Sequence, residues 1–502
     1  MARPSLRAST RKAIIPTGPP TDEILVWTET DDVERHTAQA VIDLSIRAGV
    51  AMLSTGAAAA DVTATVLLLT KAYGLSSVHV DVTYTSVTVS YHRGPHADPI
   101  TVMRIVRFRV QDFTRLERLR GLILDLSRDP IDVDEALVRF DSLLQSPHPY
   151  RRWLVVVSGG VLAAGAAGLV GGGPFIVLLS FVTATIVGRV LTWLSSAGVA
   201  SFFGQCVGAG IPTVVATLVV IAQSAGISFF GDVSPSLVVA AGIVLLLSGM
   251  SVVGAAEDAL EGYYVTAGAR AFEVVVLSLG IAVGIAVVLA IGQRLGFPIA
   301  ISSTTRLTND VVVQVICAAV IATAFAVSSY ASGRAVAAAG LAGGIGWVIL
   351  AAGEQLGLGA ITSSAGAAMA IGFGSRLLAR RLHVSALAVT TAAIVPLLPG
   401  RLAYQGISLI VTNPDRTGFN DGLPTLAQAF GLGLGLAAGV SLGAYFASLI
   451  VARMAGLRPM PAAGAPMPRG ASQRARRSLM LSDTGDLGIV VPRRRRGSPP
   501  DA

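Results

Sequence analysis

The sequence predicts a polytopic α-helical membrane protein, with about ten transmembrane helices in two five-helix repeats and a small N-terminal cytoplasmic α+β domain. Three observations lead to this prediction. Hydrophobic residues make up 53% of the 502 residues and charged residues only 14%, whereas soluble proteins carry roughly a quarter charged residues. Residues 153–452 contain long blocks without Lys or Arg. Apolar stretches of about 20 residues, the length that crosses a bilayer, recur along these blocks.

The first 150 residues have the pattern of a tail followed by a soluble domain. Residues 1–35 are rich in Pro, Thr and charge and are expected to be disordered, and Met1–Asp22 lacks the apolar core of a cleavable signal peptide. Helical periodicity over 36–56 and 57–73 then gives way to a period of two. The patterns predict three strands and two amphipathic helices, over 78–82, 87–89, 100–107, 112–127 and 132–144. Together these elements predict an α+β domain over residues 36–150.

Ten candidate membrane spans follow Arg151-Arg152. They lie near 153–172, 174–194, 198–222, 235–255, 269–291, 311–331, 335–352, 359–378, 384–411 and 423–452. Five of them form a first repeat over residues 151–292, and five form a second repeat over residues 311–452. The last two spans exceed the minimum length and are expected to be tilted, kinked or extended beyond the bilayer.

The charges of the loops predict the orientation of these spans. When the N-terminal domain is placed in the cytoplasm, most basic loop residues fall on the same side: Arg151, Arg152, Arg270, Arg334, Arg376, Arg380, Arg381 and the C-terminal tail. The loop at 292–310, with Arg294 and Arg306, is a mild exception. The positive-inside rule therefore predicts a multi-pass protein of the plasma (inner) membrane with both termini in the cytoplasm.

The net charge of +8 comes mainly from the end of the chain. Residues 453–502 hold ten Arg against three Asp, in a Pro-, Gly- and Ser-rich run without apolar periodicity. This composition predicts a disordered Arg-rich cytoplasmic tail. It does not predict a nucleic-acid partner, because such a surface interleaves basic and aromatic residues on a folded face. Cys206 and Cys317 build neither a disulfide framework nor a metal site, and no cofactor is expected.

The fourth spans of the two repeats share a pattern. Residues 236–255 and 385–406 each contain a long aliphatic run, then Leu-x-Gly, then a further apolar run. In the second of them, Pro396 and Pro399-Gly400 interrupt the span, because proline removes a backbone donor and clashes with the preceding turn. Two interpretations stay open: a broken helix whose exposed backbone binds a small polar solute, or a packing kink. Ser248-Gly249 in the first repeat is a softer break, for which a kink is favoured.

This order of elements resembles the threonine/serine exporter family. The likeness covers about residues 36–452 and rests on three motifs. The opening helix has the family's pattern at Ala48-Gly49 and Ser54-Thr55-Gly56-Ala57. The stretch after the family's fourth helix is matched by Asp258, Gly268, Arg270 and Glu273, and its Pro-Gly motif by Leu398-Pro399-Gly400 with Tyr404 and Gly406. The chain departs from the family at Ser248-Gly249-Met250, where Pro-Gly is often present. The resemblance implies a secondary transporter, not an enzyme, that exports threonine or serine across the inner membrane, driven by protons.

Few charged residues lie deep in the spans, and each such residue is a candidate for function because burying a charge in a membrane is costly. Candidate residues for coupling or gating are Asp258, Glu257, Arg270 and Arg189. Glu257, Asp258 and Glu261 are all placed to pair with Arg270 at the inner mouth, and Asp258 is the candidate proton carrier. The alternatives are an ordinary loop carboxylate for Asp258 and a snorkelling side chain for Arg189. The candidate substrate-binding residues are Pro396, Pro399, Gly400, Arg401, Tyr404 and Gln405. Arg401 is suited to a substrate carboxylate, and the alternative is a side chain that reaches outward to the membrane interface.

Two other functions remain open at this stage. A membrane-embedded hydrolase would use one of His36, His79, His92 and His96 as a general base, but none of them accompanies a Gly-x-Ser-x-Gly motif. A regulatory scaffold, whose soluble domain binds a cytoplasmic partner or gates a pore, is compatible with transport. The expected partners are thus a small amino acid, protons and the lipid bilayer, and a homo-oligomer is an option that the sequence leaves open.

Overall fold

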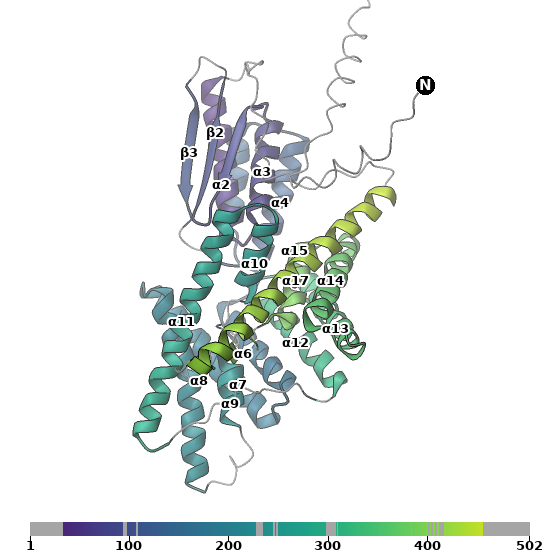
Figure 1. Ribbon diagram of the computed structural model, residues 1–502. Coiled ribbons are helices and arrows are strands. Elements are labelled where there is room, and N and C mark those ends of the chain that lie inside the picture. Colours follow the sequence, from purple (N-terminus) through teal and green to yellow (C-terminus); the bar gives the residue numbers. More distant parts are fainter. Residues whose placement is uncertain are drawn as a thin grey trace, which may run out of the picture. The chain divides into compact units, whose positions relative to one another are not determined.

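The computed structural model describes residues 34–93, 98–106, 109–226, 234–243, 246, 249–297, 308, 310–382, 384–399, 402, 405–406, 409–410 and 416–454. Almost all of the two predicted tails, residues 1–35 and 453–502, lies outside the described residues. Six of the residues singled out above lie outside them as well: His96, Ser248, Arg306, Gly400, Arg401 and Tyr404. Figure 1 shows the described helices and strands.

Residues 34–150, called the α+β part below, contain helices and strands close to the predicted positions. They are α2 Arg35–Ser54, α3 Ala59–Ala72, β1 Val78–Val82, β2 Ser86–Tyr91, β3 Ile100–Ile105, α4 Phe113–Arg128 and α5 Val133–Leu144. The strands form an antiparallel sheet in the order β1-β2-β3. In β2, the buried Val87, Val89 and Tyr91 alternate with half-buried polar residues, because successive side chains of a strand point to opposite faces.

Individual residues mark the ends of these helices: glycines at C-termini and aspartates at N-termini. Gly56 and Gly74 follow α2 and α3 with φ of 103° and 83°, a left-handed conformation that glycine adopts without steric cost at helix ends. Asp112 and Asp132 cap α4 and α5, each accepting a hydrogen bond from a backbone N–H of the first turn. Such a bond satisfies a backbone donor that has no partner within the helix.

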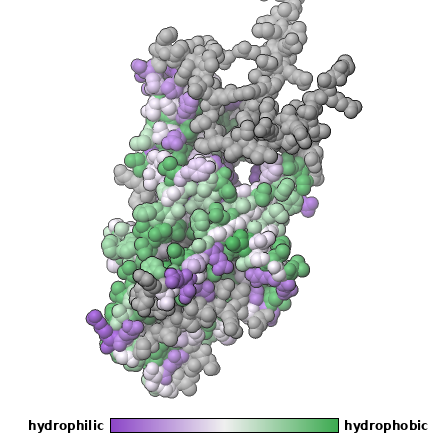
Figure 2. All heavy atoms as spheres, viewed as in Figure 1, coloured by the Kyte–Doolittle hydropathy of each residue, from purple (hydrophilic) through white to green (hydrophobic). Residues whose placement is uncertain are grey.

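The rest of the described chain consists of apolar helices. They are α6 Arg152–Leu169, α7 Pro174–Ser196, α8 Ser201–Ser224, α9 Pro235–Ile243, α10 Gly249–Leu260, α11 Tyr264–Arg294, α12 Val311–Ser328, α13 Gly333–Gln355, α14 Ala360–Leu382, α15 Ala386–Ile394, a 3₁₀ turn Val395–Leu397 and α17 Arg416–Met454. Seven of the described helices, α6, α7, α8, α11, α12, α13 and α17, are long and apolar enough to cross a membrane. Figure 2 shows hydrophobic residues covering much of the visible face. The chain is thus a polytopic helical membrane protein.

The three other predicted spans have a different form. Residues 359–378 correspond to α14, which ends in the basic residues Arg380 and Arg381. Residues 235–255 are two helices, α9 and α10, rather than one. Residues 384–411 begin with α15, which stops at Ile394 and passes into the 3₁₀ turn that holds Pro396. A total of ten spans stays a prediction.

In the first of the two predicted fourth spans, α9 ends at Ile243 and α10 begins at Gly249. Ser248 lies outside the described residues, so the choice between a broken helix and a kink at Ser248-Gly249 stays a prediction. Each predicted fourth span begins with a nine-residue helix that ends partway along the span. These helices end at Ile243 and at Ile394. Helices α6–α11 are called the first half below, and α12–α17 the second half.

Glycines bring the third and fifth helices of each half into backbone contact. In the first half, Cβ atoms at Gly280 and Gly284 of α11 would meet the carbonyl oxygens of Phe202 and Cys206 in α8. In the second half, Cβ atoms at Gly439 and Gly443 of α17 would meet the carbonyl oxygens of Ala365 and Met369 in α14. Small residues four apart let membrane helices approach closely, where packing and weak hydrogen bonds hold them together.

Candidate functional site

A buried ion pair joins α10 and α11 just after the apolar part of the first half's fourth span. Asp258 of α10 is 0% exposed, and its Oδ2 lies 3.3 Å from Nε of Arg270 in α11. Gly254 lies one helical turn before Asp258. A Cβ atom at Gly254 would collide with the guanidinium of Arg270, so the absence of a side chain there leaves room for Arg270. The pairing that the sequence offered is present. Asp258 lies in a helix and is fully buried rather than exposed in a loop, and its role in coupling stays a prediction.

The α+β part supplies the remaining surroundings of Asp258. The backbone N–H of Ala59, the first residue of α3, faces the carboxylate of Asp258, and helix N-termini favour negative charge. Burial nevertheless raises the pKa of Asp258, while Arg270, the Ala59 N–H and Arg109 act in the opposite direction. The charged form of Asp258 therefore depends strongly on Arg270, because loss of Arg270 would leave a buried negative charge without its ionic partner.

Two further carboxylates are close to Asp258: Glu257 within α10 and Glu261 just after it. Burial raises the pKa of Glu257 to about 7, and the nearby carboxylates of Glu261, Asp258 and Asp61 add to the rise, whereas Arg270 opposes it. The pKa of Glu261 is also raised to about 7, by burial and then by Asp61 and Asp258, although part of its side chain reaches solvent. Asp61 belongs to α3 and pairs with Arg120 of α4. Two of the acidic groups gathered here, Glu257 and Glu261, therefore titrate near neutral pH.

Tyr84, in the turn between β1 and β2, connects the α+β part to α11. Its hydroxyl donates a hydrogen bond to the carboxylate of Glu273. The guanidinium of Arg109 lies 3.7 Å from the centre of the Tyr84 ring, and that of Arg270 lies 5.9 Å from it. Arg109 also donates to the backbone carbonyl of Tyr84. Because of burial and the bond to Glu273, the pKa of Tyr84 is raised to about 12, so its hydroxyl stays protonated and can donate at neutral pH.

Sequence reasoning missed Tyr84 and Arg109. Glu273 was noticed only through the family resemblance, and no local pattern marks a hairpin tyrosine as a partner of a residue 189 positions away. Two more hydrogen bonds complete this contact. Thr266 Oγ1 donates to the carbonyl of Val82 over 3.2 Å, and the hydroxyl of Tyr263 donates to Thr63 Oγ1 over 3.0 Å. The interactions of the α+β part with α10 and α11 are called the first-half contact below.

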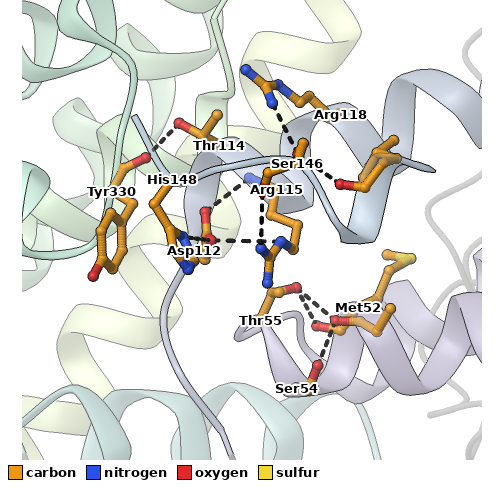
Figure 3. A network of polar contacts seen from close by, with 12 residues as sticks. Met52, Ser54, Thr55, Asp112, Thr114, Arg115, Arg118, Ser146, His148 and Tyr330 are labelled. Atoms are coloured by element: carbon orange, nitrogen blue, oxygen red, sulfur yellow. Dashed lines mark hydrogen bonds and ion pairs between the residues drawn. The ribbon is translucent and has the colours of Figure 1, made fainter. Parts of the chain in front are cut away.

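A second contact connects the α+β part to the turn between α12 and α13. The backbone N–H groups of Phe113 and Thr114 donate to the carbonyls of Ser329 and Tyr330 over 3.0 and 3.3 Å. Ser329 Oγ donates to Gln111 Oε1 over 3.2 Å. Figure 3 shows Thr114 beside Tyr330 in this network.

Asp112 belongs to the same network and contacts His148, which lies in the segment after α5. Its Oδ2 lies 2.9 Å from Nδ1 of His148, and the ring of His148 stacks on Tyr330 with 4.6 Å between the ring centres (Figure 3). Tyr330 has a φ of 54°, which is unusual for a residue with a side chain. The turn is therefore held in an uncommon conformation where it meets the α+β part.

An apolar core continues through this second contact. The buried core of the α+β part extends without interruption into second-half residues that are at most 1% exposed: Ala326, Ala331, Ala335, Ala338, Ala339, Ala388, Val389 and Ala392. They belong to α12, α13, α15 and the turn after α12. This core and the hydrogen bonds around Ser329 and Tyr330 are called the second-half contact below.

The predicted substrate-binding residues are only partly described. Pro396 and Pro399 are buried and Gln405 is half-buried, while Gly400, Arg401 and Tyr404 lie outside the described residues. Leu397, beside Pro396, belongs to the same buried cluster as Val253 and Ala256 of α10, so the interrupted spans of the two halves share one core. Arg189 is exposed on α7, whose main contacts are with α6, α8 and α9, and the structure does not bring it to Asp258.

Grooves on the outside of the helices do not resemble a site for an amino acid. One of about 680 Å³ lies between α6, α7 and α12, and adjoining it is one of about 490 Å³ between α6 and α12. A third, of about 470 Å³, lies between α8 and α11. Their linings are almost wholly aliphatic, as expected of surfaces that face lipid tails, whereas a zwitterion needs hydrogen-bond donors at one end and acceptors at the other.

Comparisons with known proteins cover both halves of the chain. A family model described as "Putative threonine/serine exporter" matches residues 43–292, and one described as "Threonine/Serine exporter, ThrE" matches residues 314–442. A "Probable threonine/serine exporter" of Mycobacterium tuberculosis is 36% identical over 420 residues, covering 82% of this chain and 77% of that protein. A "Threonine/serine exporter" of Corynebacterium glutamicum is 32% identical over 426 residues, covering 83% and 84%. No solved structure matches.

Proposed function

We propose, from the premise that the chain belongs to the threonine/serine exporter family, that it carries small hydroxylated amino acids out of the cell across the plasma membrane. Both relatives are named as exporters, and each similarity extends over more than four-fifths of this chain. The family and the apolar helices favour a transporter over the hydrolase alternative. Threonine and serine are the substrates that the relatives' names point to.

The observation that best supports a transport role is the interruption of both fourth spans. Helices α9 and α15 are each nine residues long, which is too short to cross a bilayer. Interrupted helices leave backbone groups without intrahelical partners, and transporters use such groups to bind substrates near the middle of the membrane. We place the substrate beside the second interruption, at Pro396, Pro399, Gly400, Arg401, Tyr404 and Gln405.

Helix lengths support two five-span halves. The first three helices have 18, 23 and 24 residues in the first half and 18, 23 and 23 in the second. The glycine contacts between third and fifth helices also recur in both halves. With five spans in each half, the second half would be inserted with opposite topology, which is the inverted-repeat arrangement of many secondary transporters.

A cytoplasmic position for the α+β part agrees with the loops that it contacts. The turns after α10 and α12 contact it through Tyr263 and Ser329, and the N–H of Ser385, before α15, faces Glu117 of α4. These turns adjoin Arg270, Arg334 and the basic end of α14, as the positive-inside rule requires of cytoplasmic loops.

Protons are the proposed coupling ion, and Glu257 and Asp258 are the groups proposed to carry them. The raised pKa of Glu257, about 7, allows it to exchange a proton near neutral pH, which is the property that a proton carrier needs. Arg270 would act as the counter-charge that exchanges partners during the cycle. In this scheme the buried pair of Asp258 and Arg270 controls the cytoplasmic mouth.

Reconstituted protein is expected to move labelled threonine or serine when a pH gradient is imposed across the vesicle membrane. The measurement is flux into or out of proteoliposomes, with and without an uncoupler that collapses the gradient. Empty vesicles and the same vesicles without a gradient are the controls. Flux that is the same with and without the gradient would remove proton coupling, and no flux of any small amino acid would remove the proposed function.

Replacing Arg401 by Ala is expected to raise the KM for threonine about 10- to 100-fold, because a hydrogen bond to a charged group contributes about 1.5–3 kcal/mol. The matched control is Arg416→Ala, which removes the same charge from the first residue of α17, outside the proposed substrate-binding residues, and is expected to leave the KM unchanged. The measurement is the initial rate of flux at increasing threonine concentration. An unchanged KM for Arg401→Ala would contradict its assignment to the substrate carboxylate.

A further inference from the structure

The α+β part contacts both halves of the membrane-embedded helices, and the two contacts differ in chemistry. An alternating-access transporter moves one half against the other around the substrate. A body attached firmly to both halves would prevent that movement. One of the two contacts must therefore open, and their composition indicates which one.

The second-half contact is a continuation of a hydrophobic core. Eight buried apolar residues of the second half belong to the same cluster as Leu116, Leu119 and Ile123 of α4. Backbone hydrogen bonds at Ser329 and Tyr330 add to it. Separating these surfaces would expose apolar side chains to water, and neither protonation nor a small substrate offsets that cost.

The first-half contact is polar. It depends on the hydrogen bonds from Tyr84 to Glu273, from Thr266 to Val82 and from Tyr263 to Thr63. Among the described residues, the buried members of the shared apolar core include no residue of α6–α11, and Tyr263, before α11, is only packed against it. Water can replace such hydrogen bonds at small net cost when a surface opens, so this contact can be released.

We infer that the α+β part moves as one body with the second half, and that Tyr84 is the positioning residue that holds the first half closed by binding Glu273 and flanking Arg270. The inference rests on the proposed transport function. Nε of Arg270 lies 3.3 Å from Oδ2 of its ionic partner Asp258, and the Arg270 guanidinium lies 5.9 Å from the centre of the Tyr84 ring. Departure of Tyr84 would uncover Arg270 and open a path for water to the buried carboxylate.

The charges at this contact give it a dependence on pH. Glu257 faces Glu261 and Asp258 on its own segment, Arg270 on α11 and Asp61 on α3, and Asp61 is partly balanced by Arg120. Because the pKa values of Glu257 and Glu261 are raised, the contact is stabilised by their neutral forms below the ordinary carboxyl range. That stabilisation is lost as the pH rises through about 7. Alkaline conditions should therefore loosen the first-half contact.

Thiol labelling at two matched positions tests the inference in the full-length protein. Cys206 and Cys317 are first replaced by Ala, and then either Thr266→Cys or Ser329→Cys is introduced. Thr266 and Ser329 are 1% and 2% exposed, and each donates one side-chain hydrogen bond across its contact. The labelling rate with a membrane-permeant maleimide reports how often each contact opens, whether or not threonine is the true substrate.

The cysteine at 266 is expected to react at least about tenfold faster than the cysteine at 329 at pH 8, after correction for thiolate fraction. Its corrected rate should fall at pH 6, and Glu257→Gln should weaken this pH dependence. Equal rates at the two positions would overturn the inference, and so would faster labelling at 329. Absent threonine flux with unequal labelling would instead count against the proposed function alone.

Removing the hydroxyl of Tyr84 separates positioning from folding. Tyr84→Phe keeps the ring against Arg109 and loses the bond to Glu273. Labelling at 266 is expected to accelerate severalfold and to lose part of its pH dependence, while labelling at 329 stays at its slow rate. Acceleration at both positions would mean that the α+β part has unfolded as a whole, and no acceleration at 266 would mean that Tyr84 holds nothing closed. Either result contradicts the role assigned to it.

Discussion

Asp258→Asn is expected to reduce gradient-driven flux at least about 100-fold. Asparagine has almost the same shape but cannot release a proton and cannot pair with Arg270, whose side chain is 14% exposed. Proton transfer by a positioned side chain typically contributes about 10²–10⁴-fold to a rate, which sets the scale expected for its loss here. The measurement is the initial rate of threonine or serine flux in proteoliposomes with equal amounts of folded protein.

An exposed pair of the same type provides the control. Asp43 lies 2.8 Å from Arg104 on the surface of the α+β part, with 38% of its side chain exposed, and exposed pairs contribute little. Asp43→Asn should leave the flux within about a factor of two. If Asp258→Asn impairs folding, the double variant Asp258→Asn with Arg270→Gln removes both charges and should recover the folded yield without recovering flux. Retained flux in Asp258→Asn would exclude it as a proton carrier.

Gly443→Ala is expected to lower the stability of the membrane-embedded part by about 1–3 kcal/mol, the usual cost of overpacking. A Cβ at this position would meet the carbonyl carbon and oxygen of Met369 and the nitrogen of Phe373. All three atoms are backbone, so α14 and α17 would have to separate because no side chain can rotate away. The measurement is the midpoint of thermal unfolding in detergent, together with the monodisperse fraction.

Gly366 is the matched control for this substitution. It lies in α14, the partner helix of Gly443, and a Cβ there meets no atom within 4 Å. Gly366→Ala should therefore raise the unfolding midpoint slightly, because alanine favours helix by about 0.8–1 kcal/mol over glycine. Opposite signs for the same change in two glycines would identify close packing as the cause. A stable Gly443→Ala protein would show that α14 and α17 have room to spare.

Local patterns predicted the elements of the α+β part and most of the spans, because hydrophobic periodicity and capping residues act within a few positions. The pairing of Asp258 with Arg270 was within reach for the same reason, since only one turn separates their helices. Prolines marked the interruption at Pro396. The interruption after Ile243 has no proline, and Gly249 alone does not distinguish a break from a continuous helix.

The contacts across long stretches of chain were not predictable from one sequence. Tyr84 and Glu273, or Gln111 and Ser329, are about 190 and 220 positions apart, and no periodicity relates residues at such distances. The alanines of α13 and α15 that complete the core of the α+β part read simply as small residues in membrane helices. Only the folded structure shows that these alanines belong to the same buried apolar cluster as the core of the α+β part.

The shared apolar core joins residues that are translated at different times. Most of the α+β part leaves the ribosome first, whereas Ala335, Val389 and Ala392, which complete its core, are translated only after α6–α11. Until then, Leu116 and its neighbours lack part of their partners, and apolar surface left uncovered is prone to aggregation. The core of the α+β part is therefore complete only once the second half has been translated and inserted.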